Sequence, residues 1–439
     1  MSELPTSKLS DIADVIDSLH KTPKYSETGY PMVRCVDLNY GRLKLKNTQY
    51  VSEEVFNEYS RRYSPSIGDI IITRVGANFG VTSYVEETEF CLGQNTAAII
   101  PTNVNARYLY YILNSFVGRQ QMNMSVAGAA QPTLSLKAIK NIDVPRLGDI
   151  AEKKIATIAG ALDDKIELNR QTNQTLEQMA QAIFKSWFVD FEPTRAKIAA
   201  KLKGQDPERA IMAAISGKAI AELDQLSPDT QQQLRITAAL FPDTLVDSEL
   251  GEIPKGWEAS SLVKHFDVVM GQSPKGDTYN ENGDGMLFFQ GRRDFGFRYP
   301  TPRVYTTDPK RLAKTGDTLI SVRAPVGDRN MAIQECCLGR GVAGIRHKSG
   351  ARSFTYTFIG HIEKNLSDSG SDGTVFSSIN KNELGAVGFI APTENLLAIF
   401  EEKIASLDQR VEVNSKEIVT LEEMRDSLLP RLLSGSLEI

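Results

Sequence analysis

The chain has 439 residues, more than one hydrophobic core usually serves, so we expect two or three domains. Its hydrophobic content of 41% and charged content of 24% are typical of a globular protein, and the absence of a run of about 18 apolar residues predicts no membrane span. We expect no signal peptide, and four cysteines without a C-x-x-C pair predict a reduced, cytoplasmic location.

Charge is unevenly distributed along the chain, whose formal net charge is −5. Residues 1–146 hold 15 Lys and Arg against 14 Asp and Glu, and residues 257–392 hold 17 against 14. These two blocks are mildly basic, and the acidity lies in the segments that follow them. The whole-chain charge argues weakly against a nucleic-acid partner, whereas the charge of the two blocks is compatible with one.

The first block, residues 1–146, has the signals of a compact α+β domain. GDIIITRVGANFG (68–80) contains a short β-branched run that is opened by a Gly-Asp turn. VTSYVEE (81–87) and NTAAII (95–100) predict further strands, and ARYLYYILNSF (Ala106–Phe116) predicts a helix.

A long helix is predicted for residues 147–190, with Asp149–Phe188 as its core. Apolar and asparagine positions step by three and four along it, which is the period of a left-handed helix pair. At about 1.5 Å per residue this helix would be roughly 60 Å long. Residues 191–256 follow as an Ala-rich linker of short helices, interrupted at Pro207 and Pro228.

The second block, residues 257–392, repeats signals of the first. GDTLISVRAPVGD (316–328) corresponds to GDIIITRVGANFG, and CLGRGVAGI (337–345) corresponds to CLGQNTAAI (91–99). MAIQECCL (331–338) predicts strand structure, and a helix is predicted at Arg352–Leu366.

The segment 393–439 repeats the long helix. ALDDKIELNRQTNQTLEQM (161–179) and SLDQRVEVNSKEIVTLEEM (406–424) are identical at eight of 19 positions. The sequence therefore predicts an α+β fold with a pseudo-two-fold internal repeat, in which two similar α/β domains are joined by a pair of long antiparallel coiled-coil helices. Asn169 and Asn414 lie beside the helix centres, where a buried asparagine pair would fix the register. The alternative is that both face solvent.

No catalytic site is recognisable in the sequence. The four histidines lack the spacing of a zinc site, and the chain has no P-loop, no G-x-S-x-G and no Gly-rich turn for a dinucleotide or S-adenosylmethionine. We therefore expect a non-catalytic protein that holds no metal and no cofactor of its own.

Polar side chains in the loops of the two blocks are the candidates for ligand contact. Arginine can bind guanine in a bidentate manner, and asparagine or glutamine can bind adenine, so these residue types suit the major groove of DNA. The candidates are Arg74, Asn78, Gln94, Asn95 and Gln131 in the first block, and Gln290, Arg292, Arg293, Arg323, Arg329 and Arg340 in the second, with Arg298 nearby. The alternative for each is a solvated loop residue.

Both long helices end in apolar sequence. AIFKSWFVDF (182–191) contains four aromatic residues where the helix seam needs only one or two, and SLLPRLLSG (427–435) ends the second helix. Such residues either pack against the adjacent block or dock another protein. The docking candidates are Phe184, Trp187, Phe188, Leu428 and Leu432.

At these residues the chain resembles the specificity (S) subunit of type I restriction–modification systems. The resemblance is carried by GDIIITRVG, GDTLISVRAPVG, TLEQMAQAIFKSWF, LLPRLLSG and GEIPKGW, whose order extends it over nearly the whole chain. It implies that the two blocks are target-recognition domains, that each reads one half of a split double-stranded DNA target, and that the helices fix the spacer between the halves.

The resemblance also implies partners. Two methyltransferase (M) subunits would dock on the chain and methylate adenine with S-adenosylmethionine, and restriction (R) subunits would add ATP- and Mg-dependent translocation and cleavage. The loop candidates then become DNA-binding residues, and the apolar helix-end candidates become M-docking residues. The runner-up is a tandem-domain adaptor that joins two protein partners without touching DNA. A self-contained nuclease or methyltransferase would need a cofactor site that the sequence lacks.

Overall fold

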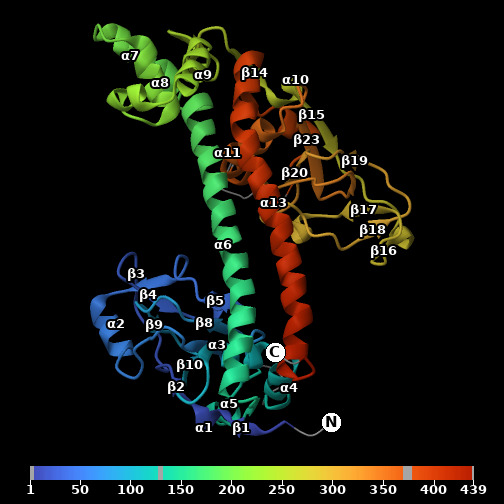
Figure 1. The fold of residues 1–439 in the computed structure, drawn as a ribbon. Coiled ribbons are helices and arrows are strands. Elements are labelled where there is room, and N and C mark those ends of the chain that lie inside the picture. The colour runs from blue at the N-terminus through green and yellow to red at the C-terminus, as the bar shows by residue number, and fades with distance from the viewer. Residues whose placement is uncertain (1–3, 127–131, 369–377, 438–439) are drawn as a thin grey trace. The chain divides into compact units, whose positions relative to one another are not determined.

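The computed structural model of the chain describes residues 4–126, 132–368 and 378–437. The chain divides into two units, Met1–Leu168 with Glu417–Ile439 and Asn169–Lys416. Each unit contains a β-rich domain and half of each of two long helices, α6 (Asp149–Phe188) and α13 (Glu394–Leu433) (Figure 1). The predicted α+β fold with two similar domains and a pair of long helices is confirmed.

Two sheets form the domain of the first unit. Their strand orders are β2–β10–β7–β8–β5 and β3–β6–β4–β9, and β1 pairs with β11. The elements are β1 (Thr6–Lys8), α1 (Leu9–Ile12), β2 (Ala13–Asp17), β3 (Tyr25–Ser26), β4 (Tyr30–Val33), η1 (Cys35–Asp37), β5 (Gly41–Arg42), β6 (Gln49–Val51), α2 (Glu53–Tyr59), β7 (Ile70–Thr73), β8 (Thr82–Tyr84), β9 (Cys91–Leu92), β10 (Thr96–Pro101), α3 (Ala106–Asn114), α4 (Phe116–Met124), α5 (Leu136–Lys140) and β11 (Asp143–Pro145).

The central strand β7 contains an unbroken apolar run because both of its faces are buried. Successive side chains of a strand point to opposite faces. Ile70 and Ile72 accordingly enter the core that is shared with α3, whereas Ile71 enters the core beneath the second sheet. Burial on both faces accounts for the unbroken apolar run. Helix α3 begins where the Asn105 side chain accepts a hydrogen bond from the Tyr108 backbone N–H at 3.1 Å.

The domain of the second unit repeats this architecture. Its sheets have the orders β15–β23–β20–β21 and β16–β18–β17–β22–β19, and β14 pairs with β24. The elements are β14 (Glu258–Ser261), α10 (Leu262–His265), β15 (Phe266–Met270), η3 (Gly276–Thr278), β16 (Tyr279–Asn280), β17 (Met286–Phe289), η4 (Arg292–Asp294), β18 (Tyr305–Thr306), β19 (Leu312–Ala313), β20 (Thr318–Ser321), β21 (Arg329–Met331), β22 (Cys336–Leu338), β23 (Val342–His347), α11 (Arg352–Asp368), α12 (Lys381–Gly385) and β24 (Gly388–Ala391).

The internal repeat is confirmed strand by strand. Strands β2, β10, β7 and β8 of the first unit occupy the same places in their sheet as β15, β23, β20 and β21 of the second. The predicted helices at Ala106 and Arg352 correspond to α3 and α11. One prediction needs correction, because MAIQECCL is divided between the end of β21 and β22, which belong to different sheets.

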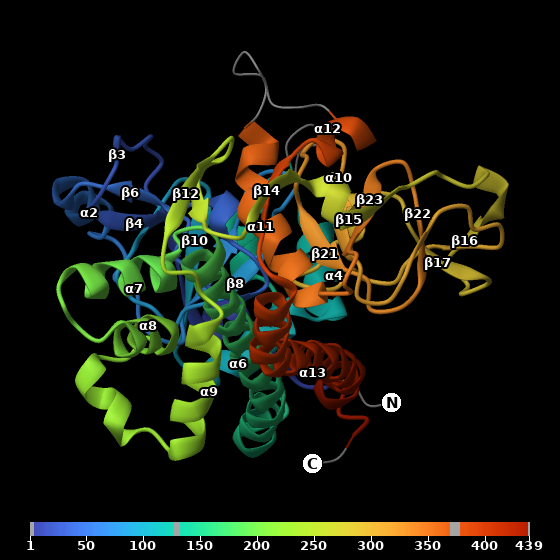
Figure 2. The same ribbon diagram turned by 90° about the horizontal axis from the view of Figure 1, so that it is seen from above.

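The linker forms α7 (Glu192–Leu202), α8 (Pro207–Ser216), η2 (Ile220–Gln225), α9 (Pro228–Ala239) and a hairpin of β12 (Leu245–Ser248) and β13 (Gly251–Pro254). Helices α7, α8 and α9 form one group (Figure 2). Asp206 caps α8, Pro207 occupies its first turn, and Gly217 ends it with a φ of 68°, so the predicted break at Pro207 is a helix start.

The long helices run antiparallel within each unit. In the first unit, Asp163 contacts Arg425 at 2.8 Å and Lys165 contacts Glu417 at 3.4 Å, so positions rise along α6 as they fall along α13. Most of the apolar and asparagine positions predicted to form the seam are buried or half-buried, but Ile158 is exposed. Where the sequence leaves Met424 or Arg425 as alternatives for one position, Met424 is exposed and Arg425 is partly buried. The pseudo-two-fold relation and the division at residues 146, 190, 256 and 392 stay predictions.

Within the described ranges, no helix is long and apolar enough to cross a membrane.

Candidate nucleic-acid interface

Backbone hydrogen bonds bring three loops of the second unit together where β17, β20 and β22 end. The Gly339 N–H donates to Phe289 O at 2.8 Å, and the Gly341 N–H donates to Gln290 O at 3.2 Å. The Val322 N–H donates in turn to Gly341 O at 3.0 Å. We call this set, Gln290–Arg293, 322–323 and 339–341, the second loop cluster.

Glycine is required where these loops meet. A Cβ atom on Gly341 would lie 2.7 Å from Gln290 O, and one on Gly339 would lie 2.8 Å from Gln290 Cα. Real Cβ atoms do not approach backbone so closely, so only glycine permits this packing. The glycines of the CLGRG sequence therefore place Arg340 beside Gln290.

The second loop cluster presents five of the predicted contact residues to solvent. They are Gln290, Arg292, Arg293, Arg323 and Arg340. Arg292 pairs with Asp328 at 2.7 Å, in a bridge whose arginine side chain is 49% exposed. Such exposed pairs contribute little to stability, so the guanidinium can exchange its partner for a phosphate or a base at small cost.

The first unit builds the same frame from different residues. The Gly93 N–H donates to Val33 O, the Arg74 N–H to Asn95 O and the Leu134 N–H to Arg74 O, each at 2.8 Å. We call 34–35, 74–75 and 93–95 the first loop cluster. The Arg74 N–H donates to Asn95 O as the Val322 N–H donates to Gly341 O, so Arg74 and Val322 are equivalent. Arg323 is then equivalent to Val75, and the loop arginines Arg74 and Arg323 occupy different positions.

The side chains of the first loop cluster have more hydrogen-bond and ion-pair partners within the chain than those of the second. Arg74 is mostly buried, forms an ion pair with Asp17 and donates from Nε to Leu134 O at 3.2 Å. Asn95 has a left-handed φ of 65°, and Gln94 donates to Thr22 Oγ1 at 3.5 Å. Asn78 is exposed. Gln131 lies outside the described residues.

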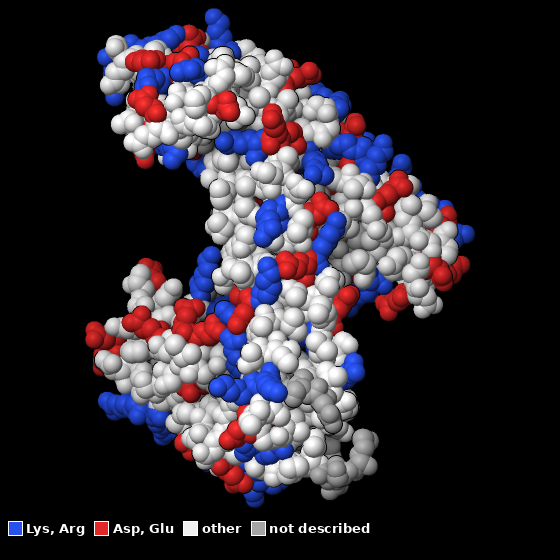
Figure 3. Space-filling view, in the orientation of Figure 1, with Lys and Arg blue, Asp and Glu red and all other residues white. Residues whose placement is uncertain are grey.

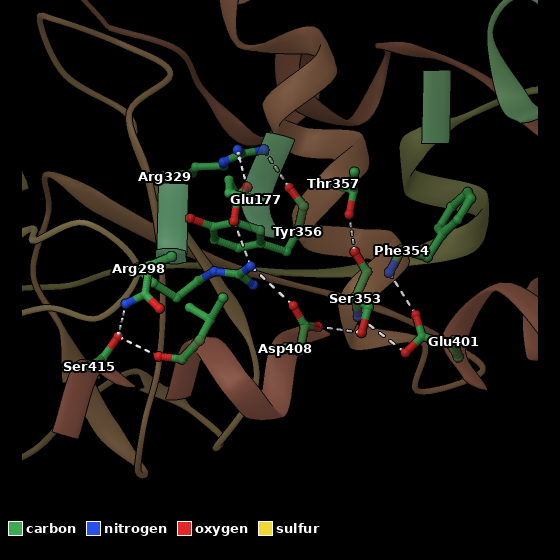
Figure 4. A network of polar contacts seen from close by, with 12 residues as sticks. Glu177, Arg298, Arg329, Ser353, Phe354, Tyr356, Thr357, Glu401, Asp408 and Ser415 are labelled. Atoms are coloured by element: carbon green, nitrogen blue, oxygen red, sulfur yellow. Dashed lines mark hydrogen bonds and ion pairs between the residues drawn. The ribbon is translucent and has the colours of Figure 1, made fainter. Parts of the chain in front are cut away.

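Arg329 and Arg298 lie apart from the exposed loops, in a buried cluster with Glu177, Ser353, Tyr356 and Asp408 that we call the inner network (Figure 4). The Arg298 side chain is 3% exposed and reaches Glu177 at 2.5 Å and Asp408 at 3.0 Å. Arg329 reaches Glu177 at 2.8 Å, and both guanidinium groups lie over the Tyr356 ring. Burial raises the pKa of Tyr356.

The inner network joins the domain to both helices. Glu177 belongs to α6 and Asp408 to α13, whereas Arg298 and Arg329 belong to the domain. The Asp408 carboxylate also accepts from Ser353 Oγ at 2.6 Å. A buried charge without its partner is costly, so these arginines have to remain paired while the domain is folded. Arg329 was predicted to lie in a loop, but it begins strand β21. DNA contact by Arg329 stays a prediction that would require exchange of its carboxylate partner Glu177.

Glu177 and Asp408 were missed by sequence reasoning, although a signal exists. Asp408 is the repeat counterpart of Asp163, which in the first unit accepts from Tyr111 Oη at 2.7 Å and from Arg425 at 2.8 Å. A carboxylate that recurs at the same position of both helices was thus a sign of a repeated anchoring role.

The first unit anchors its domain through neighbouring residues. Arg42 and Arg107 both contact Asp164 of α6, at 2.6 and 2.8 Å, and Arg42 also contacts Glu86 at 2.9 Å. Partial burial alone would raise the pKa of Asp164, but the hydrogen bonds from Arg107 and Arg42 lower it. Asp164 therefore stays ionised as an anchor.

The predicted docking residues lie largely within the cores of the chain itself. Phe184, Trp187 and Phe188 are buried, and Trp187 meets Phe241 edge to face at a centroid distance of 5.3 Å. Leu432 is buried in the core of the first unit, and Leu428 packs against that core. This burial supports the packing alternative for these residues, and their role in docking stays a prediction.

The helix pair contains buried asparagines near its predicted centre. Asn414 Nδ2 donates to Asn173 Oδ1 at 2.9 Å, and Asn173 Nδ2 donates to Ser415 Oγ at 3.3 Å. Asn169, one turn away from Asn173, is 2% exposed. Neither Asn169 nor Asn414 faces solvent, but the pairing of these two with each other stays a prediction.

Positive and negative side chains are intermingled on the face of the molecule seen in Figure 3. Among the described residues, no cluster of three His, Cys, Asp or Glu side chains could hold a metal ion. The loop clusters offer hydrogen-bond donors and exposed arginines, which are the groups that contact base edges and phosphates.

The fold and these loops define a class: two repeated recognition domains carried on an antiparallel helix pair. Residues 1–178 match the family of the type I restriction modification DNA specificity domain. A Haemophilus influenzae protein, the HindI type I restriction enzyme specificity subunit, is 30% identical over 84% of this chain and 86% of its own length. The MjaIX specificity subunit of Methanocaldococcus jannaschii is 23% identical over 98% of this chain and 93% of its own length.

The chain belongs to the family of type I restriction enzyme specificity subunits. Its fold is also similar to the crystal structure of a type I restriction-modification system S subunit from M. genitalium, with a TM-score of 0.56 and 12% identity over 98% of this chain and 96% of that one. The predicted resemblance is confirmed, and DNA recognition is favoured over the adaptor alternative.

Proposed function

We propose that this chain reads a bipartite double-stranded DNA target, with one domain on each half-site. The proposal is carried by one observation: two domains with the same backbone frame present different side chains at the same loop edge. The second loop cluster offers arginines and Gln290, and the first offers Asn95, Gln94 and the paired Arg74. Loops of equal geometry and unequal chemistry suit two half-sites of different sequence.

The chain works as the non-catalytic member of a larger complex. Methyltransferase subunits, two in number, supply S-adenosylmethionine-dependent adenine methylation, and restriction subunits supply ATP-driven cleavage. The relatives are named specificity subunits of restriction enzymes, which supports this division of labour. Because the target is cellular and invading DNA, the complex acts in the cytoplasm.

A genome-wide map of N6-methyladenine tests the proposal. The map is compared between cells that carry the gene, cells that lack it and cells in which it has been restored. We expect one split motif to lose methylation on deletion and to regain it on restoration. Unchanged methylation, in cells whose methyltransferase subunit is shown to be expressed, would contradict the proposal.

A further inference from the structure

We propose that Arg42 and Arg298 are positioning residues, which hold the DNA-reading segment of each domain against the long helices. The inference deepens the proposed function and rests on it. It concerns one segment that occurs twice: the first reading segment, Arg34–Arg42, which follows β4, and the second reading segment, Gln290–Arg298, which follows β17.

The two reading segments are equivalent by their hydrogen bonds. Val33 O accepts from the Gly93 N–H, and Phe289 O accepts from the Gly339 N–H in the same way. Val33 lies nine positions before Arg42, and Phe289 lies nine positions before Arg298. Each segment also contains a single 3-10 turn, η1 or η4. The far ends lie beside equivalent strands, because Leu43 N–H donates to Tyr84 O of β8 and Met331 N–H of β21 donates to Arg298 O, both at 2.8 Å.

The two ends of the second reading segment differ in environment. Its first residues, Gln290, Arg292 and Arg293, are exposed. Its last residue, Arg298, is held by Glu177 and Asp408 and lies 4.0 Å from the centre of the Tyr356 ring (Figure 4). Arg292, at the exposed end, also lines the cavity of about 300 Å³ that Glu177 and Tyr356 line. The exposed end is thus a short, tethered continuation of the buried one.

The first reading segment has a weaker anchor of the same kind. Arg42 contacts Asp164 at 2.6 Å and Glu86 at 2.9 Å, but its side chain is 30% exposed. Arg298 is almost fully buried and bridges two helices, whereas Arg42 meets one helix and shares Asp164 with Arg107. Since screening weakens partly exposed pairs, the anchor of the second domain should matter more.

The physical consequence is precision at the reading end. A contact to a base edge depends on placing a donor within a few tenths of an ångström, and a short segment fixed at both ends has few alternative conformations. Arginine suits the anchor at Arg298 because one guanidinium nitrogen, Nη2, reaches both carboxylates while the planar group stacks on the Tyr356 ring. Loss of the Arg42 or Arg298 ion pairs should reduce base discrimination in only one half of the target.

The test uses the full-length chain, expressed from its own locus with its partners. Arg298→Gln and Arg42→Gln are compared with the wild type by mapping methylation at the motif and at all its single-base variants. Arg209→Gln is the control, because Arg209 forms an exposed ion pair with Asp224 in the linker helices. Arg298→Lys is a second variant that keeps the charge but loses the planar group that stacks on the Tyr356 ring.

We expect Arg298→Gln to lose about tenfold discrimination in one half-site, which is the size of one well-placed base contact. Arg42→Gln should show a smaller loss in the other half-site, Arg298→Lys a partial loss in the same half as Arg298→Gln, and Arg209→Gln no change. A general folding defect would instead lower methylation of all sites equally.

The outcomes separate the two proposals. A wild-type map without any split motif defeats the proposed function itself. A wild-type motif whose two halves respond equally to the Arg298 variants, or do not respond, overturns the positioning role while leaving the function intact. If Arg298→Gln does not accumulate as folded protein, Arg298→Lys and Arg42→Gln decide the matter by the same criterion.

Discussion

At the scale of single residues, the asparagines of the helix pair show how polarity can be built into an apolar seam. Asn414 is fully buried and donates to Asn173, and within the described chain its own Oδ1 has no hydrogen-bond partner. Leucine at such a position would bury more apolar surface, so the asparagines lower stability and specify register instead.

Replacing one asparagine of the pair should therefore lower the free energy of unfolding, whereas replacing both should not. Asn414→Ala leaves the Asn173 amide without its donor, and we expect a loss of about 1–3 kcal/mol in the free energy of unfolding, measured with urea. The double change to leucine at 173 and 414 should recover that loss. Asn282→Ala, at an exposed position, is the control. A neutral Asn414→Ala would contradict this account of the seam.

A buried histidine makes the stability of the second unit depend on pH. Burial, and secondarily the nearby His265, lower the pKa of His347 to about 4. An unfolded histidine titrates near 6.5, so the folded state loses stability as the pH falls from about 6.5 towards 4, by up to about 3 kcal/mol. Above pH 7 the group contributes no pH dependence.

The His347→Phe variant should isolate this effect. Phenylalanine keeps the ring packing against Phe266 and Phe354 but cannot be protonated. Unfolding free energies measured between pH 7 and pH 4 should fall less steeply for the variant than for the wild type. Equal slopes would show that His347 is not the group responsible.

At the scale of elements, α11 is held to α13 through its first turn. The Glu401 carboxylate of α13 accepts from the backbone N–H groups of Ser353 at 3.2 Å and Phe354 at 2.6 Å. A carboxylate at a helix N-terminus satisfies donors that have no partner inside the helix and interacts favourably with the helix dipole.

Glu401→Gln should destabilise the chain because both carboxylate oxygens are in use. The NH2 group of the glutamine would face a backbone N–H of Ser353 or Phe354, so that one donor would lose its acceptor. We expect the free energy of unfolding, measured with heat or urea, to fall by about 2 kcal/mol. Glu402→Gln, at the adjacent exposed position, should change stability by less than about 0.5 kcal/mol. Equal effects of the two changes would rule out a capping role for Glu401.

The elements also show what sequence reasoning can and cannot reach. The helix Asp149–Phe188 was predictable to the residue because its apolar period persists over forty positions. The strand pair within MAIQECCL was not, because two short strands in different sheets leave no periodic signal. The loop clusters were only half predictable: residue chemistry indicated Arg323 and Arg340, but burial of Arg74 and Arg298 depends on carboxylates that are distant in sequence.

At the scale of the whole molecule, the proposal that the helices set the spacer predicts a simple change of target. Four residues inserted after Leu168 in α6, together with four inserted after Lys416 in α13, lengthen both helices by about 6 Å. That is close to two base pairs at about 3.4 Å each. Methylation mapping should find the same half-sites separated by about two further base pairs.

Insertion into α6 alone is the matched control. It should put the seam positions before and after the insertion out of register, so that the pairs Lys165–Glu417 and Asn173–Asn414 cannot both be kept, which destabilises the chain and leaves no defined new spacing. If the double insertion accumulates as folded protein and methylates the original motif, the helices do not determine the spacer.

The first unit is assembled from both ends of the chain. Its core includes Leu432 and Leu433 from the last turn of α13, and Leu4 and Leu147 lie near Gly435. During synthesis, the domain that emerges first from the ribosome is therefore the last to be completed, whereas the second unit already has all its residues. Nascent chains that stop short of residue 417 would carry all residues of the second unit and a first unit whose core lacks Leu432 and Leu433.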